Sequence, residues 1–284
     1  GYKSIMVNCN PETVSTDFDL ADRLYFEPIT FEDVMNIIDF EKPDGVLVQF
    51  GGQTPLKIAN QLKEAGIKIF GTSSDSINLA EDREAFTKLV NKIEVTIPNY
   101  CIAKNYDEIV AYSEKATFPV LVRPSYVLGG RAMQIVYSKK ELVDYVFRSA
   151  EATSDHPILI DQFIENAFEF DVDALCDGKD VFIAGIMQHI EEAGIHSGDS
   201  SCVLPAHKIS NKVKKEIIDV TNKLAKALNV VGLINLQFAV KDEIVYVLEV
   251  NPRSSRTVPF VSKYSNIPLA NIAAQLSVGK KLKD

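Results

Sequence analysis

The chain has 284 residues, of which 46% are hydrophobic and 24% are charged. This is the composition of an ordinary globular protein that is long enough for two compact units. Its formal charge of −9 disfavours a nucleic-acid partner held mainly by phosphate contacts, so any polyanion must be met locally. No apolar run approaches the roughly 20 residues of a membrane helix, which excludes membrane spanning.

Four cysteines, Cys9, Cys101, Cys176 and Cys202, lie far apart without a CxxC spacing. This pattern favours neither a zinc site nor a disulfide framework. We therefore expect buried thiols in a reducing cytoplasm. The chain also starts within a strand pattern, without an initiator methionine or a basic leader, and we expect it to be a piece of a longer polypeptide.

The first 80 residues alternate short apolar strands with amphipathic helices, the rhythm of βαβ units and of a small parallel sheet. Elements are expected at 4–8, 31–40, 45–50, 54–65 and 67–70. Thr30 and Thr54 stand at helix N-cap positions, and Gly66 stands at a C-cap. Residues 51–53 lack the GxGxxG pattern, so they indicate a tight turn rather than a dinucleotide site.

After a polar helix at 81–92, the pattern changes to strands joined by short turns, which makes the fold class mixed, α/β and α+β. A helix at 106–116 is followed by strands at 120–123 and 133–137 around a glycine-bearing loop. The remaining elements are a helix, three strands, another helix and a final pair of strands. They are expected at 140–150, 158–163, 169–176, 181–189, 211–228, 233–240 and 244–251.

The final pair of strands predicts a hairpin around Lys241–Glu243. A three-residue turn would place Gln237 opposite Val247 and Asn235 opposite Glu249. One face would then be an apolar core face, made of Ile234, Leu236, Phe238, Val240, Ile244, Tyr246, Leu248 and Val250. The other face would collect oxygen-bearing side chains, Asn235, Gln237, Glu249 and Asn251.

Unpaired polar groups on a buried face each cost on the order of 1–3 kcal/mol, so these four side chains need a partner. Mg²⁺ takes oxygen ligands, and phosphates and water complete its octahedron. We predict that Gln237, Glu249 and Asn251 bind magnesium and that Glu249 bridges two ions. The alternative is a polar face turned to solvent, which a hairpin taken alone allows equally well.

Arg253 and Arg256 follow the predicted ligands directly. A salt-bridged surface loop is the alternative, but guanidinium groups beside a metal–phosphate centre neutralise the charge that builds during phosphoryl transfer. A second element, 123–131, carries paired glycines between Arg123 and Arg131 and suits a polyphosphate. It is not a P-loop, and alone it would more often be a hairpin tip. Together the two elements predict an ATP-dependent ligase or kinase.

Histidines give a weaker signal. His196 lies in a polar, glycine-bearing loop at 192–200, where its ring suits a ribose hydroxyl or a phosphate. A loop histidine satisfied by its neighbours is the alternative. The other three, His156, His189 and His207, show no metal-ligand spacing such as HExxH and are assigned no role.

Taken together, these motifs resemble the ATP-grasp superfamily, in which ATP lies between two mixed α and β units under a glycine-loop lid. The resemblance spans the whole chain and is closer still to the family of carbamoyl phosphate synthetase large chains, in the C-terminal of their two similar halves. The motifs that carry it are Asn8–Asp17, Gly51–Pro55, Glu81–Arg83, Arg123–Arg131, His196–Asp199 and Glu249–Arg253.

The resemblance implies a ligase that phosphorylates carbamate with ATP to give carbamoyl phosphate, for arginine and pyrimidine synthesis, in the cytoplasm. A separate glutaminase small subunit would supply ammonia. The implied cofactors are ATP and two Mg²⁺ or Mn²⁺ ions, with K⁺ as a further candidate. Neither nucleic acid nor membrane is an expected partner.

The resemblance also implies a domain division. Residues 1–76 would be a partial pre-ATP-grasp, Rossmann-like domain whose first strand and glycine-rich turn are missing, leaving an incomplete sheet with an unpaired edge. Residues 77–278 would be the ATP-grasp domain, with a lid at about 117–163. Residues 279–284 would begin a further domain.

Residue by residue, the resemblance gives each motif a role. The phosphate-facing and lid positions are Arg83, Arg123, Gly129, Gly130 and Arg131. The adenine, ribose and nucleotide-loop positions are Gln162, Ile164, Glu169, Gly194, Ile195, His196 and Ser197. Gln237, Glu249 and Asn251 match the metal ligands, with Gln237 and Glu249 also contacting ATP, and the catalytic positions are Asn251, Arg253 and Arg256. Gln162 stands where some relatives are expected to have histidine.

Three alternatives are weighed against this interpretation. A biotin-carboxylase-like ligase of the same superfamily would have lysine at position 123 and a longer glycine run. A module that binds ATP without turnover is opposed by the intact Glu249, Asn251, Arg253 and Arg256. A dinucleotide-dependent oxidoreductase lacks its phosphate fingerprint.

Overall fold

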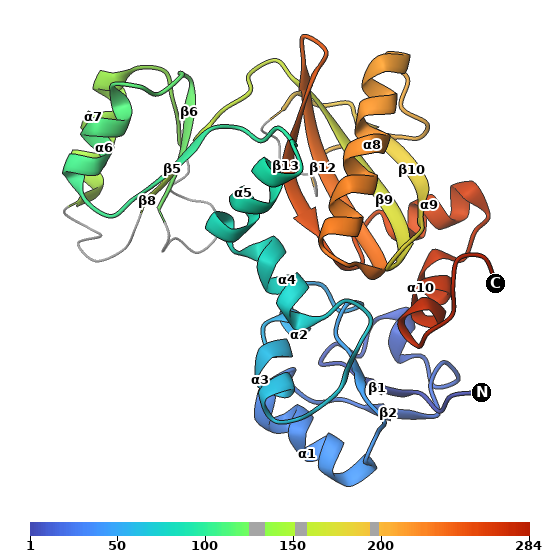
Figure 1. The fold of residues 1–284 in the computed structure, drawn as a ribbon. Coiled ribbons are helices and arrows are strands. Elements are labelled where there is room, and N and C mark those ends of the chain that lie inside the picture. Colours follow the sequence, from blue (N-terminus) through green and yellow to red (C-terminus); the bar gives the residue numbers. More distant parts are fainter. Residues whose placement is uncertain (125–133, 151–157, 194–198) are drawn as a thin grey trace.

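The computed structural model describes residues 1–124, 134–150, 158–193 and 199–284. In these residues the strands form two parallel pairs near the N-terminus, a four-stranded sheet and a five-stranded sheet (Figure 1). The mixed α/β and α+β class is thereby confirmed. No helix in the described part combines the length and the apolar character needed to cross a membrane.

The N-terminal region contains two parallel strand pairs where we expected one small sheet. β1 (Ile5–Val7) pairs with β2 (Arg23–Tyr25), and β3 (Val46–Leu47) pairs with β4 (Ile69–Phe70). Their strands are only two or three residues long. α1 (Phe31–Glu41) covers this region.

Caps decide where these helices begin and end. As predicted, Thr30 caps α1 by accepting a hydrogen bond from the Asp33 N–H. The helix predicted at 54–65 is instead two helices, α2 (Gln53–Leu56) and α3 (Ala59–Glu64). Thr54 lies inside α2 and is not its cap, because the helix begins at Gln53 after Gly52. Gly66 follows α3 with φ +81°, as its predicted C-terminal position requires.

The polar helix predicted at 81–92 is observed from Arg83 onward, and a helix that we had not predicted precedes it. α4 (Ser74–Glu81) and α5 (Arg83–Lys92) meet at Asp82. Asp82 ends α4, and its carboxylate accepts from the Ala85 N–H at 2.8 Å to cap α5. This junction sets the position of Arg83, the first residue of α5.

The four-stranded sheet has the order β5-β8-β6-β7 and is antiparallel throughout. Its strands are β5 (Tyr100–Ala103), β6 (Val120–Pro124), β7 (Gln134–Val136) and β8 (Ile158–Gln162). α6 (Tyr106–Ser113) and α7 (Lys139–Ala150) lie together on one side of it (Figure 1). The predictions for the other elements are confirmed apart from their ends, the largest error being the end of α6, predicted at 116, whereas we had predicted no bounds for β5.

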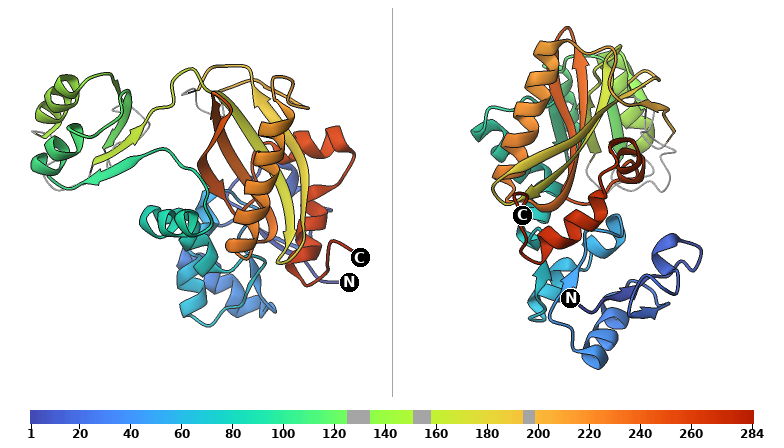
Figure 2. Two further views of the ribbon diagram at one scale, coloured as in Figure 1. Left: turned by 45° about the horizontal axis from the view of Figure 1, so that its top comes forward. Right: turned by 90° about the vertical axis from the view of Figure 1, so that its right-hand side faces the viewer.

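The five-stranded sheet has the order β11-β10-β9-β12-β13. Its strands are β9 (Phe168–Asp177), β10 (Val181–His189), β11 (Cys202–Val203), β12 (Val231–Lys241) and β13 (Ile244–Asn251). α8 (Asn211–Ala227) packs across one face, and α9 (Val258–Ser265) and α10 (Leu269–Ser277) pack against one end of the other (Figures 1 and 2). We had not predicted β11, α9 or α10.

The β12–β13 hairpin has a shorter turn than predicted. Asp242 and Glu243 form it alone, with φ of 51° and 59°, the conformation that tight hairpins favour. A regular ladder from a two-residue turn would put Leu248 opposite Gln237. Instead a β-bulge falls at Leu248 and brings Glu249 opposite Gln237. The predicted pairings were wrong, yet the four polar side chains share a face.

The two-residue turn and the bulge together change the membership of the core face. This face is made of Ile234, Leu236, Phe238, Val240, Val245, Val247 and Val250, all of which pack in the core cluster under α8. Ile244, Tyr246 and Leu248 were wrongly assigned to it. With a two-residue turn, their positions fall on the other face or at the bulge, and Ile244 and Leu248 are 48% and 41% exposed.

Candidate functional site

The face of the five-stranded sheet opposite α8 carries rows of oxygen-bearing side chains. They come from alternate positions on three neighbouring strands: Glu169, Asp171 and Asp173 on β9, Asn235 and Gln237 on β12, and Glu249 and Asn251 on β13. The register sets Asp171, Gln237 and Glu249 side by side. This dense set of carboxylate and amide oxygens is a donor set suited to Mg²⁺ or another hard cation.

Burial differs along these rows. Asp171, Asp173 and Asn251 are 3%, 1% and 6% exposed, whereas Glu249 is exposed at the edge strand. The Asp171 Oδ1 atom is buried and has no hydrogen-bond partner among the described residues. The three predicted metal ligands, Gln237, Glu249 and Asn251, are thus brought together on one face, and their role as ligands stays a prediction.

Arg253 lies directly beside the predicted ligands. Its Nη2 donates to Asn251 Oδ1 at 3.0 Å, and its Nη1 donates to the Ser254 carbonyl at 3.0 Å. Burial lowers the pKa of Arg253, and the charges of Glu249 and Glu81 oppose that shift. Arg253 remains a cation, while Arg256 is exposed to solvent.

A second pair of arginines shares one carboxylate. Asp161 on β8 is 6% exposed and forms ion pairs with both Arg83 and Arg123, accepting from Arg123 Nε at 2.9 Å. The Arg83 guanidinium also lies 4.8 Å from the centre of the Tyr100 ring. Two of the three arginines predicted to face phosphate, Arg83 and Arg123, are therefore held together, and we had not predicted Asp161 as their common partner.

Electrostatic interaction joins this pair to the hairpin. Burial lowers the pKa of Arg83 to about 10, with the charge of Arg123 adding to the shift. Burial also lowers the pKa of Arg123, while the charge of Glu249 opposes the shift. The charge of Glu249 therefore affects two arginines in different parts of the chain: Arg123 on the four-stranded sheet and Arg253 just after β13. The carboxylate of Glu249 favours the charged form of both arginines.

The predicted adenine and ribose positions lie near one another. Ile164, 7% exposed, packs with Ala239, and the β9–β12 register sets Glu169 opposite Ala239. Gln162 on β8 accepts from the Asn99 N–H at 3.3 Å. Seven further predicted positions fall outside the described residues: Gly129, Gly130, Arg131, Gly194, Ile195, His196 and Ser197.

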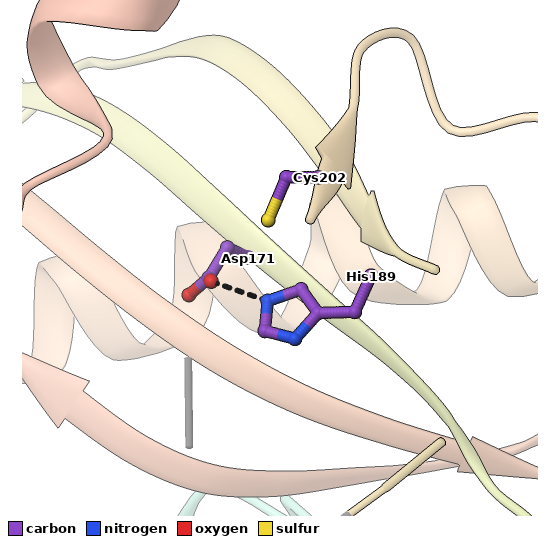
Figure 3. A group of neighbouring side chains, drawn as sticks. All are labelled: Asp171, His189 and Cys202. Carbon is purple, nitrogen blue, oxygen red and sulfur yellow. Dashed lines mark hydrogen bonds and ion pairs between the residues drawn. The ribbon is translucent and has the colours of Figure 1, made fainter. Parts of the chain in front are cut away.

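A histidine to which we had assigned no role lies on the polar face (Figure 3). His189 Nε2 is 2.7 Å from Asp171 Oδ2, and Nδ1 is 3.3 Å from Glu169 Oε2. Burial alone would lower the pKa of His189, but the hydrogen bonds and charges of Asp171 and Glu169 outweigh it and raise the pKa to about 9. The ring is therefore a buried cation between two carboxylates at neutral pH.

Cys202 completes this group, because one ligand atom each from Asp171, His189 and Cys202 lie within 4.8 Å of one another. Burial raises the pKa of the Cys202 thiol to about 11, and nearby carboxylates add to the shift. Without an ion, the high pKa values of the ring and the thiol keep both groups protonated, so an ion bound here would have to displace those protons. Only the alternating acids at 169, 171 and 173 signalled it in the sequence.

The four cysteines only partly match the expected burial. Cys176 is buried, but Cys9 is exposed and Cys101 and Cys202 are half-buried. All four are free thiols. Cys9 is exposed because it follows the short β1 strand, outside the packed part of the first region.

The fold is the ATP-grasp fold, as comparison with solved structures shows. The biotin carboxylase domain of Hydrogenobacter thermophilus 2-oxoglutarate carboxylase, solved with MgADP, ADP and bicarbonate, has a TM-score of 0.77 at 18% identity. That match covers 99% of this chain and 65% of the other. Biotin carboxylase from Campylobacter jejuni, solved with β,γ-ATP, has a TM-score of 0.75 at 17% identity, covering 98% and 65%.

Sequence comparison narrows this class to one family. Residues 1–79 match the carbamoyl phosphate synthase preATP-grasp domain, and residues 82–284 match the ATP binding domain of the carbamoyl-phosphate synthase L chain. The carbamoyl phosphate synthase large chains of Archaeoglobus fulgidus and Pasteurella multocida are 61% and 58% identical over 100% of this chain. The chain belongs to the carbamoyl phosphate synthase large-chain family. It spans 26% of the length of these two relatives.

Proposed function

We propose that the chain transfers the γ-phosphoryl group of ATP to carbamate, as the second ATP-grasp half of a glutamine-hydrolysing carbamoyl phosphate synthase large chain. The observation that carries this proposal is the shared face of Gln237, Glu249 and Asn251, beside which Arg253 Nη2 donates to Asn251 Oδ1 at 3.0 Å. Phosphoryl transfer requires cations around a metal–phosphate centre. The product would feed arginine and pyrimidine synthesis.

The polar face fits the proposed magnesium or manganese ions. Gln237, Glu249 and Asn251 supply oxygens side by side, and the Asn251 Oδ1 that accepts from Arg253 keeps a second lone pair. When bound, two divalent ions would shield the phosphate charges, and K⁺ is a further candidate cation. The Asp171 Oδ1 atom, which has no hydrogen-bond partner among the described residues, would offer a cation a further oxygen on this face.

The side chains around this face would contact the other parts of the substrates. Ile164 supplies an apolar contact for adenine, and Glu169 accepts from ribose hydroxyls. Arg83 and Arg123 hold phosphate oxygens, because Asp161 presents both guanidinium groups from fixed positions. Arg253 and Arg256 neutralise the charge on the transferring group.

We also propose a domain division, a partner subunit and a cellular compartment for this chain. We place a partial pre-ATP-grasp domain at 1–76, the ATP-grasp domain at 77–278 with its lid at about 117–163, and the start of another domain at 279–284. A glutaminase small subunit would act through the full-length large chain. The four free thiols support a reducing cytoplasm.

The reverse reaction tests the function. The protein is incubated with MgADP and carbamoyl phosphate, and ATP formation is measured. Glu249→Gln should lower the rate by about 10²–10³-fold, the usual cost of removing one electrostatic partner of a transition state. Glu243→Gln is the matched control, because Glu243 is an exposed carboxylate in the turn of the same hairpin, paired with Lys212. It should leave the rate within twofold.

Three outcomes would contradict the proposal or the role of Glu249 in it. Binding of MgADP without any ATP formation would favour a unit that binds nucleotide without turnover. ATP hydrolysis that requires bicarbonate and biotin would favour a biotin-carboxylase-like ligase, the reaction type of the structural neighbours. Equal loss in Glu249→Gln and Glu243→Gln would remove Glu249 from the site.

A further inference from the structure

We propose that two buried side chains, Gln49 and Asp173, are positioning residues that clamp the arginine loop, residues 252–257, from opposite sides. The clamp holds Arg253 and Arg256 at the transferring group, so the inference rests on the proposed function. Neither side chain was singled out by the sequence. One belongs to the N-terminal region and the other to the five-stranded sheet.

Asp173 holds the second half of the arginine loop. It lies on β9, is 1% exposed, and accepts from Ser255 Oγ at 2.8 Å and from Thr257 Oγ1 at 2.6 Å. Asn235 Nδ2 donates to the same carboxylate at 3.0 Å. Because Ser255 and Thr257 flank Arg256, the backbone on both sides of that arginine is tied to the sheet.

Gln49 holds the first half of the loop. It is 1% exposed just after β3, and its Nε2 donates to the Pro252 carbonyl at 2.8 Å. Its backbone carbonyl accepts from the Ser254 N–H at 2.9 Å. Pro252 and Ser254 flank Arg253, so each arginine of the loop lies between two fixed neighbours.

Gln49 is itself fixed by a second residue of the N-terminal region. Its Nε2 donates to Thr72 Oγ1 at 2.9 Å, and its Oε1 accepts from the Thr72 N–H at 3.0 Å. Thr72 Oγ1 also accepts from the Val231 N–H at 3.0 Å, at the start of β12. The side chain of Gln49 therefore has little freedom to move away from the loop.

The neighbouring glycine leaves room for this arrangement. Gly71 has φ +86°, and a Cβ placed on it would lie 2.1 Å from Gln49 Oε1. Any other residue there would displace the amide as well as strain the backbone. The N-terminal region thus contacts the arginine loop through the side-chain amide of Gln49, which Gly71 leaves room for. This contact gives the N-terminal region a direct part in the proposed chemistry.

The clamp is tested by measuring kcat for ATP formation and the KM for MgADP separately, because a positioning residue should affect kcat and leave KM almost unchanged. Misplacing a catalytic group by about 1 Å can cost about 10²-fold in rate. We expect Gln49→Ala to lower kcat for ATP formation about 10–100-fold and to change the KM for MgADP less than threefold. Asp173→Asn should behave in the same way, because its amide would present a donor where Thr257 needs an acceptor.

A double-mutant cycle separates positioning from general structural damage. On an Arg253→Ala background, Gln49→Ala should cost less than threefold, because the group that it positions is already gone. An undiminished 10–100-fold loss on that background would overturn the inference. Gln188→Ala is the matched control, since Gln188 is also 1% exposed and accepts from two backbone N–H groups, those of His207 and Lys208.

Limited trypsin digestion tests the clamp without relying on turnover. The bonds after Arg253 and Arg256 should be cut at least fivefold faster in Gln49→Ala and Asp173→Asn than in the wild type. Gln188→Ala and Asp177→Asn should match the wild type, because Asp177 is a buried β9 carboxylate that accepts from the Lys179 and Leu282 N–H groups, outside the arginine loop. Equal acceleration in the controls would mean general loosening and would overturn the inference. If the wild type formed no ATP, the proposed function would fail while this digestion still decided the clamp.

Discussion

The two faces of the five-stranded sheet both contain deeply buried side chains but are chemically opposite. Under α8, Ile234, Leu236 and Phe238 are 0% exposed and pack in one apolar cluster. On the other face, Asp173 and Asn235 are 1% and 3% exposed. The same strands supply both faces, because successive side chains of a strand point to opposite sides.

The comparison teaches that burial alone does not mark the core of this protein. Several buried groups of the polar face satisfy one another, because Asn235 donates to Asp173 and the His189 cation lies against Asp171. The apolar face gains its stability from area removed from water. A change on one face should therefore damage stability, and a change on the other should damage chemistry.

The largest effect should follow from moving a residue from one face to the other. Deleting Val250 would leave Glu249 opposite Gln237 but bring Asn251 opposite Leu236, on the core face. The lost valine and the buried amide together should cost on the order of 4–6 kcal/mol, and the proposed metal site would lose a ligand. Urea unfolding and the ATP-formation assay measure the two losses.

Deleting Leu248 is the matched control for this change. Leu248 is the extra residue of the bulge, so its removal leaves a regular ladder in which Val247 still pairs with Phe238 and Glu249 with Gln237. This variant should keep both faces and lose no more than about 2 kcal/mol. Equal damage from the two deletions would show that side-chain parity is not what the bulge preserves.

A smaller effect should come from replacing a large side chain on the apolar face with a small one, without changing the register. Phe238→Ala removes a fully buried ring and should cost about 3–5 kcal/mol of unfolding free energy. The KM for MgADP should stay within twofold in the folded protein. Phe182→Ala, which removes a ring that is 40% exposed, should cost less than about 1 kcal/mol. If Phe238→Ala changed the KM for MgADP strongly and left the unfolding free energy unchanged, the apolar face would not be limited to a role in stability.

The smallest effect concerns the pH dependence of the polar face. The pKa of His189 is raised from 6.5 to about 9 in the folded protein. Its stabilisation is therefore complete below pH 6.5 and is lost as the pH rises through about 9, a loss of at most about 3 kcal/mol. His189→Asn should flatten this decline in unfolding free energy, whereas His207→Asn, at an exposed ring, should not.

The Cys202 thiol titrates in a higher pH range than His189, so the contributions of the two groups to the pH profile can be distinguished. The Cys202 pKa is raised from 9.0 to about 11, so its contribution declines only as the pH rises from about 9 through about 11. Cys202→Ser should change that upper part of the profile alone. A decline between pH 6.5 and 9 that persists in His189→Asn would contradict the assignment to the ring.

Much of the ATP-grasp half followed from local patterns. Strands 181–189 and 244–251 were predicted with their observed ends, because alternating or continuous apolar runs with turn residues on both sides define them. The grouping of Gln237, Glu249 and Asn251 on one face was also predicted. Its geometric reason was wrong, since a bulge at Leu248 is a tertiary accommodation that no local pattern encodes.

What the sequence missed depends on contacts between distant segments. Asp161 meets Arg83 across 78 positions, and Gln49 meets Pro252 across 203. Nothing in the local pattern distinguishes a buried glutamine with three partners from an exposed one. His189 was set aside for the same reason, because its significance comes from carboxylates on the neighbouring strand β9.

Asp161 carries a consequence for how this acidic protein meets a polyanion. Two guanidinium groups share one carboxylate, so the trio keeps a single net positive charge in a chain whose overall charge is −9. Because both side chains are already fixed, a nucleotide would lose less affinity to side-chain ordering when it binds. Salt would weaken that attraction less than for freely exposed arginines, because the groups are partly buried.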